Sequence, residues 1–163
     1  MKLRITFLLL AGLVTSSAVN AASVTTTLNV STAVGGSCSV SAAGIAFPYN
    51  ANTITNANGS VTVNCIIGTA YSIALDAGLH YNGGARMVAD ANSNAIQYSL
   101  YQDNNLNLLW GDNGVTYQAP VVNDSGSGSG QVHTVYGALN ANAFIGSIVP
   151  GQYNDTVNVT INY

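Results

Sequence analysis

Residues 24–34 read V-T-T-T-L-N-V-S-T-A-V, and apolar or β-branched side chains occupy every second position. These positions are Val24, Thr26, Leu28, Val30, Thr32 and Val34. Alternation with a period of two indicates a β-strand that buries one face. A half-apolar strand near a chain end is an aggregation hazard unless another strand pairs with it. The strand therefore completes either its own domain or a neighbouring molecule, and this choice decides which function the sequence predicts.

The residues before this stretch have the pattern of an export signal. Lys2 and Arg4 supply a positive beginning, residues 5–14 are apolar, and residues 19–21 fit a small-residue cleavage site. We predict a signal peptide over residues 1–21 and a mature chain that begins at Ala22. The apolar run is too short to span a bilayer, and about 140 residues remain for one domain with a real core.

The predicted mature chain is poor in charge. Arg86 is its one basic residue besides histidine, against six aspartates and no glutamate. Such a chain cannot neutralise a phosphate backbone, so we expect no nucleic-acid partner. The abundant Asn, Ser and Thr suit a β-rich extracellular protein packed against its own copies, or simply a neutral secreted domain. Arg86 itself is either a buried partner for an aspartate or a solvated strand residue.

Two cysteines, Cys38 and Cys65, are present in this exported chain. An even and small number of cysteines in an oxidising compartment favours one disulfide. The alternative is a metal site with two thiolates. It lacks further ligands, because His80 and His133 stand in no ligand spacing.

Alternation predicts further strands throughout the chain. We expect them at residues 38–40 with 45–49, 60–67, 70–76, 85–89, 95–102, 106–110, 115–117, 131–139 and 153–163, with turns or loops at 50–59, 82–84, 90–94 and 123–130. No segment shows a helical period, so an all-β sandwich is predicted. The last strand places Val157, Val159, Ile161 and Tyr163 on one face. Since no residues follow it here, its outer edge is expected to stay open to another strand.

The sequence offers little catalytic chemistry. The Ser-Gly repeat at 125–130 does not match a nucleophile elbow, and we expect His133 to be a solvent-facing strand residue. Asp90-x-Asn92-x-Asn94 resembles the start of a calcium loop but lacks its glycine and final glutamate, which favours an Asx-type turn. We therefore predict no catalytic residue, no metal and no cofactor.

Several blocks together resemble the spore coat protein U domain, the fold of archaic (Csu-type) chaperone–usher pilus subunits. They are the region of Cys38, Arg86-Met87, the block Y-S-L-Y-Q-D at 98–103, Trp110-Gly-Asp112, Val135-Tyr136-Gly137 and the ending G-Q-Y-N-D-T-V-N-V-T-I-N-Y at 151–163. The match covers essentially the whole mature chain and keeps the order of the motifs, and the last block is the most specific.

The resemblance implies an incomplete immunoglobulin-like β-sandwich that donor-strand complementation completes. Residues 22–34 would be the N-terminal donor strand and residues 35–163 the pilin-like domain. A periplasmic chaperone would lend a strand first, and at an outer-membrane usher an identical or related subunit would replace it. The product would be an extracellular pilus that serves adhesion or biofilm formation. The donor residues would be Val24, Thr26, Leu28 and Val30, and the acceptor edge would be Val157, Val159, Ile161 and Tyr163.

Two alternatives stay open at this point. The chain could be a secreted structural protein of the spore-coat type that forms no pilus. It could also be an enzyme or a small-ligand binder built on a sandwich, for which the sequence supplies no motif.

Overall fold

The computed structural model describes residues 24–163, which lie in two units. Residues 24–33 belong to an N-terminal segment, and residues 34–163 form a compact unit. The predicted signal peptide and residues 22 and 23 fall outside the described residues. All regular elements of the described chain are strands, and they are β1 (Cys38–Ala43), β2 (Ile54–Cys65), β3 (Ala70–Leu75), β4 (Arg86–Ala89), β5 (Ala95–Tyr101), β6 (Val122–Ser125), β7 (Gln131–Ile145) and β8 (Val159–Asn162).

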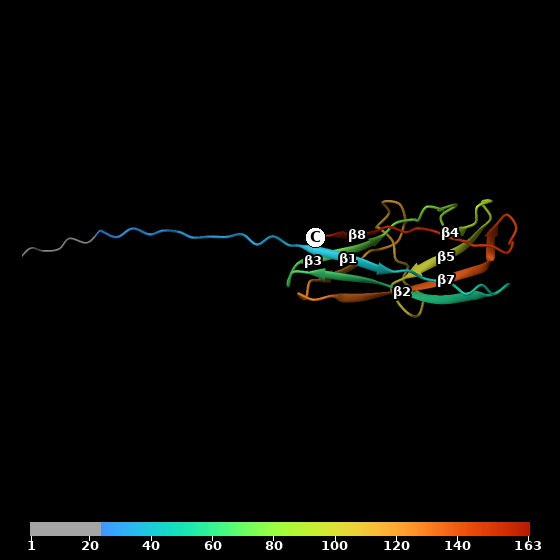
Figure 1. Ribbon diagram of the computed structural model, residues 1–163, viewed down its shortest axis with the longest axis horizontal. Helices are drawn as coiled ribbons and strands as arrows, with labels where there is room; N and C mark the ends of the chain where they lie inside the picture. Colours follow the sequence, from blue (N-terminus) through green and yellow to red (C-terminus); the bar gives the residue numbers. More distant parts are fainter. Residues whose placement is uncertain (1–23) are drawn as a thin grey trace, which may run out of the picture. The chain divides into compact units, whose positions relative to one another are not determined.

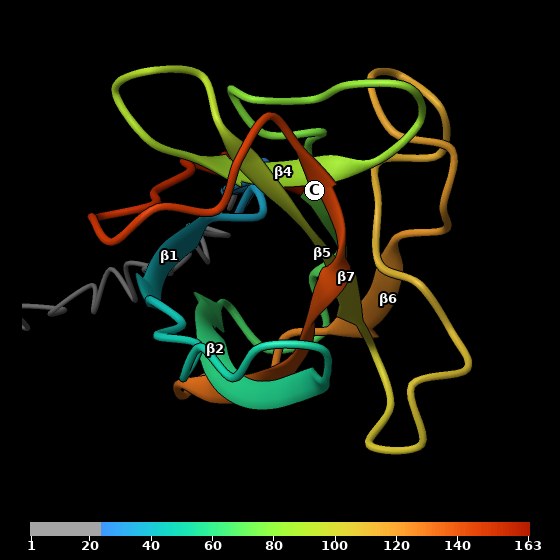
Figure 2. The ribbon, with the colours of Figure 1, turned by 90° about the vertical axis from the view of Figure 1, so that its right-hand side faces the viewer.

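The strands form two antiparallel sheets (Figures 1 and 2). The larger sheet has the order β1-β2-β7-β5-β4, and the smaller has the order β6-β3-β8. In Figure 1, β1, β2 and β7 lie along the same axis of the sandwich, and β2 is antiparallel to both of its neighbours. The prediction of an all-β sandwich is therefore confirmed, with β1 at one edge of the larger sheet and β8 at one edge of the smaller.

The core lies between the sheets and follows the predicted alternation. Val61, Val63 and Cys65 of β2 are buried, as are alternate residues of β3 and β5. The core cluster consists of Val61, Val63, Cys65, Tyr71, Ile73, Leu75, Ile96, Tyr98, Leu100, Trp110, Val135 and Leu139. Burial of a large apolar side chain stabilises the fold by about 1.5–3 kcal/mol, so this cluster holds the two sheets together.

Some predicted element boundaries are wrong. Residues 54–59 extend β2 although asparagines favour turns, because each pairs with a residue of the long strand β7. Likewise, part of the predicted loop at 123–130 belongs to β6, which pairs with β3. Residues 45–49 form no strand, and of residues 153–163 only β8 does.

Two further predicted strands, at 106–110 and 115–117, are loops instead. Both are shaped by aspartate carboxylates that accept hydrogen bonds from backbone amides. Asp103 accepts from the amides of Asn107 and Leu108, the latter at 2.7 Å. Asp112 accepts from the amides of Thr116 and Tyr117, both at 2.8 Å. Such local bonds give the backbone an alternative to strand pairing.

Candidate functional site

The compact unit contains an apolar groove of about 1020 Å³. On one side lies the chain from the end of β1 to Tyr49, and on the other lie residues 148–157 and the start of β8. Both segments border the same side of the sandwich in Figure 2. The floor consists of core side chains, namely Val61, Leu75, Val88, Ile96, Tyr98, Leu100, Val135 and Leu139.

The groove is bordered by the end of β1, at Ala42 and Ala43, and by the start of β8, at Val159, and both strands lie at sheet edges. Among the residues that the structure describes, neither β1 nor β8 pairs with a strand on its outer side. An unpaired edge presents a row of free N–H and C=O groups, which is a template for another strand. In a closed sandwich a strand here would cover the floor. The arrangement can therefore accept one extended segment with alternating apolar side chains.

Prolines mark both sides of the groove. Pro48 lies in the first wall and Pro150 in the second. Proline cannot donate to a strand ladder, so it is confined to edges and irregular segments. The sequence analysis did not identify these walls, and the two prolines within otherwise apolar stretches were the available signal.

The second wall is attached to the floor by a partly buried polar cluster. Asp155 accepts a hydrogen bond of 2.5 Å from the hydroxyl of Tyr98 and bonds of 3.1 Å from the backbone amide and Nδ1 of His80. Burial raises the pKa of the Tyr98 hydroxyl, and the bond to the Asp155 carboxylate raises it further. Tyr98 therefore stays a protonated hydrogen-bond donor. Sequence analysis missed this cluster because its members lie far apart in the chain.

The predicted acceptor residues divide into two pairs. Val157 and Val159 line the groove. Ile161 packs against the core cluster, and Tyr163 is exposed. Of the four, Val159 and Ile161 lie within β8. The role of all four as an acceptor edge stays a prediction.

The predicted donor residues are exposed in the single chain. The exposed fractions of Val24, Leu28 and Val30 are 96%, 88% and 87%, and Thr26 is exposed as well. Residues 24–37 have no strand assignment. The predicted strand is thus not formed in the single chain, where residues 24–34 pair with no strand of the part that the structure describes. Its formation on another molecule stays a prediction.

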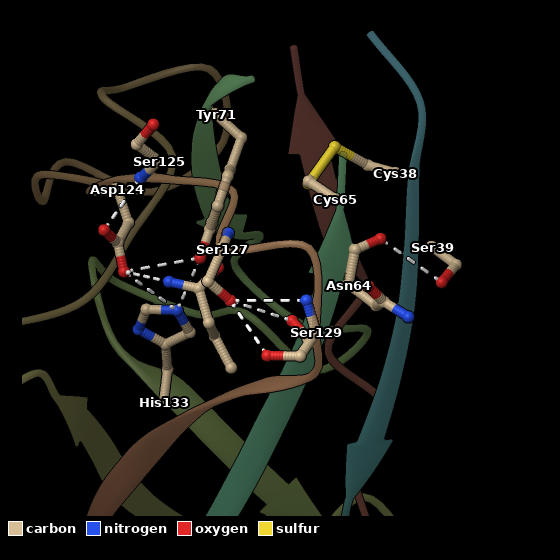
Figure 3. Close-up of a disulfide and its surroundings, with 11 residues drawn as sticks. Cys38, Ser39, Asn64, Cys65, Tyr71, Asp124, Ser125, Ser127, Ser129 and His133 are labelled. Atoms are coloured by element: carbon tan, nitrogen blue, oxygen red, sulfur yellow. Dashed lines mark hydrogen bonds and ion pairs between the residues drawn. A yellow bond between two sulfur atoms is a disulfide. The ribbon is translucent and has the colours of Figure 1, made fainter. Parts of the chain in front are cut away.

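The predicted disulfide between Cys38 and Cys65 is confirmed (Figure 3). The two residues are direct partners in the register of β1 and β2. Beside the bond, the Ser39 hydroxyl donates to the carbonyl of Asn64. The covalent link holds the beginning of edge strand β1 against the sheet, and with it one side of the groove.

The prediction for His133 is wrong. Its side chain is only 16% exposed, because it lies between the sheets against Tyr71 and Asp124 (Figure 3). Its Nε2 is 2.9 Å from the Tyr71 hydroxyl and 3.6 Å from the Asp124 carboxylate. Burial raises the pKa of Tyr71, and the Asp124 charge adds to this shift. The three side chains form a polar contact between the sheets beside the disulfide.

Arg86 fits neither of its two interpretations fully. It is fully buried, but its guanidinium donates to the backbone carbonyls of Leu75, Asp76 and Trp110 rather than to a carboxylate. Burial lowers its pKa, and nearby tyrosines and aspartates oppose that shift. We assign it a structural role next to the groove floor.

The segment at Asp90 is the expected Asx-type turn. Its carboxylate accepts from the amides of Asn92 and Asn94 and from the Asn94 side chain, each at 2.8 Å. The Asn94 side-chain bond is the main reason that the pKa of Asp90 is lowered. Within residues 24–163 no group of three metal-ligating side chains comes together.

A model of the spore coat protein U domain matches residues 24–160. The chain belongs to this family. The predicted family resemblance is thus confirmed over nearly the whole described chain. A search of curated proteins finds no match.

A solved structure supports the fold of this spore coat protein U domain. It is the CsuC-CsuE chaperone-tip adhesion subunit pre-assembly complex from archaic chaperone-usher Csu pili of Acinetobacter baumannii. It shows 21% identity and a TM-score of 0.54 over 80% of this chain and 40% of that chain. A weaker likeness is to a chaperone-tip adhesin complex described for CFA/I fimbriae biogenesis, with 12% identity and a TM-score of 0.42 over 75% of this chain and 40% of that chain. This domain thus spans less than half the length of either.

The two sheets have edge strands without an outer partner among the described residues, and the fold is similar to that of the Csu complex. Together these observations confirm the predicted incomplete immunoglobulin-like sandwich. The likeness at this level of identity concerns the fold alone.

Proposed function

We propose that the mature protein is a structural subunit of an extracellular pilus, polymerised by donation of its N-terminal strand to a neighbouring subunit. The observation that carries the proposal is the apolar groove bordered by the end of β1 and the start of β8, two edge strands that have no outer partner among the described residues. Membership of the spore coat protein U domain family supports it. The chain would be exported through the periplasm, where a chaperone fills the groove, and assembled at an outer-membrane usher.

The N-terminal segment has the right character for the groove. From Val24 to Val30 an extended chain spans about 20 Å at about 3.3 Å per residue. Burying Val24, Leu28 and Val30, which are nearly fully exposed in the single chain, is worth roughly 5–9 kcal/mol before ordering costs. Backbone hydrogen bonds to both edges would add affinity that depends little on side chains.

Such an assembly has no natural end. Each subunit gives a segment to one neighbour and receives a segment from another, so the contact is heterologous. A heterologous contact that does not close into a ring produces a filament. The proposal thus accounts for a fibre without any second interface.

The experiment compares two substitutions on opposite faces of the predicted donor strand. Leu28→Asp places a charge on the face that would enter the groove, and Thr27→Asp places the same charge on the opposite face. We expect the exported Leu28→Asp protein to form no fibres in electron microscopy and to run as a monomer or chaperone complex. The Thr27→Asp protein should polymerise as the unaltered chain does.

Three outcomes would contradict the proposal. Fibres that survive Leu28→Asp would remove the donor segment from the mechanism, and equal loss in both variants would remove the role of its apolar face. If the unaltered exported chain forms no end-to-end polymer, the alternative of a non-pilus coat protein is favoured. Capture of Leu28→Asp by the chaperone should persist, because the chaperone would occupy the groove rather than the donor segment.

A further inference from the structure

Tyr98 contacts both walls of the groove from its floor. It lies on β5, is buried, and lines the groove. Its ring centroid is 6.0 Å from that of Phe47, at an interplanar angle of 47°. Phe47 belongs to the wall that follows β1. An aromatic pair at this separation is stabilising beyond the area that it buries.

The opposite end of the same side chain is bonded to the second wall. The Tyr98 hydroxyl donates to Asp155, whose side chain is only 3% exposed. The preceding residue, Asn154, exchanges two backbone hydrogen bonds of 2.9 Å with Ala89 of β4. The wall is therefore fixed to the larger sheet here, although it continues into β8 of the smaller sheet.

We propose that Tyr98 sets the separation of the two walls and so keeps the groove open for an incoming strand. This inference rests on the proposed function, because it concerns the same groove. A buried carboxylate that loses a donor carries a large desolvation penalty. The bond from Tyr98 therefore restrains residues 150–157, while the ring restrains the wall at Phe47.

A groove held in its binding shape binds more tightly than one that must be ordered first. The apparent dissociation constant equals the intrinsic constant divided by the fraction of molecules in the competent shape. Loss of one hydrogen bond to a charged group shifts such an equilibrium by about 10- to 100-fold. Tyr98 would thus act as a positioning residue for strand capture.

The test uses the full mature chain with Leu28→Asp, so that it cannot donate its own strand. A fluorescent peptide of residues 22–34 serves as the probe, and anisotropy measures its affinity. Tyr98→Phe keeps the ring but removes the hydroxyl, and we expect affinity to fall by about 10- to 100-fold. Hydrogen exchange should quicken in residues 148–157 and stay unchanged in β2 and β7.

Tyr101→Phe is the matched control. Tyr101 lies on β5 like Tyr98, but it does not line the groove. Peptide affinity in this variant should stay within about threefold of the parent. Asp155→Asn, which keeps an acceptor for Tyr98, should weaken binding less than Tyr98→Phe.

Each outcome decides between the two ideas. If the peptide fails to bind the parent chain, the proposed function is overturned and this inference with it. Equal binding to the parent and to Tyr98→Phe overturns the inference alone, as does an equal loss in Tyr101→Phe. Should Tyr98→Phe fail to fold, Asp155→Ala takes its place, because it removes the acceptor of the Tyr98 hydroxyl. Unchanged affinity and exchange in Asp155→Ala would then overturn the inference.

Discussion

Replacing Arg86 tests how the domain is held together beside the groove. Its guanidinium makes four hydrogen bonds of 2.6–2.9 Å to three backbone carbonyls, and its Cζ lies 4.1 Å from the ring centroid of Tyr117. The carbonyls belong to Leu75, Asp76 and Trp110, so one side chain joins the end of β3 to the loop that begins at Trp110. Arg86→Met removes all four bonds while keeping much of the side-chain volume.

The expected loss follows from the groups left behind. A buried carbonyl without a partner costs about 1–3 kcal/mol, and Arg86→Met leaves three such carbonyls, while loss of the buried charge itself removes a desolvation cost and offsets part of this. We expect Arg86→Met to lower the free energy of unfolding by about 4 kcal/mol, a large share of the stability of a small domain. Arg86→Lys keeps the charge but not the planar fork, and should recover less than half of the loss.

The assay is urea unfolding followed by the fluorescence of Trp110, the one tryptophan of the chain. Its indole is buried and donates to the carbonyl of Ile73, so its emission reports on the core. A loss below about 1 kcal/mol in Arg86→Met would refute the reasoning, since it would mean that water or other groups satisfy the carbonyls. Full recovery by Arg86→Lys would show that charge matters and the fork does not.

Two further predictions concern the disulfide and acid stability. Serine at Cys38 and Cys65 should lower the free energy of unfolding by about 3–4 kcal/mol in the chain-entropy model, measured by urea unfolding with reduced and oxidised parent chains as controls. Burial pushes the pKa of Asp112 upward, but hydrogen bonds from the Thr116 side chain and from backbone amides outweigh it and lower the pKa overall. Because the folded pKa is depressed, its contribution to stability is present above the unfolded value of about 3.9 and is lost as pH falls through the folded pKa. Asp112→Asn should flatten this acid limb of the stability curve, and an unchanged limb would contradict the assignment.

The sandwich and its core could be predicted from the sequence because they depend on local alternation. Val61, Val63 and Cys65 share a face by spacing alone, and the structure buries all three. The disulfide could also be predicted, since a chain with a predicted signal peptide and two cysteines has one possible internal pairing. These inferences need no knowledge of which strands become neighbours.

The walls of the groove and its polar cluster could not be predicted in this way. Asp155 meets His80 and Tyr98 across 75 and 57 positions of sequence, and His133 meets Tyr71 across 62. No local pattern encodes such pairs, because they depend on how the sheets are stacked. Whether Arg86 is buried or solvated could not be predicted for the same reason, since its acceptors are backbone carbonyls that any residue could supply.

The composition of the two edge strands indicates whether the groove binds a strand from a partner. Proteins usually protect an exposed edge with charged side chains, proline or a bulge, since an unprotected edge invites other chains. The sequences of β1 and β8, C-S-V-S-A-A and V-T-I-N, carry no charge and no proline. The floor of the groove that they border is apolar, and no strand of the described residues covers it. A monomer with this surface would be prone to uncontrolled association. A strand supplied by a partner would satisfy both edges and the floor at once, which is why we infer that the open groove is a binding site and not a defect of the fold.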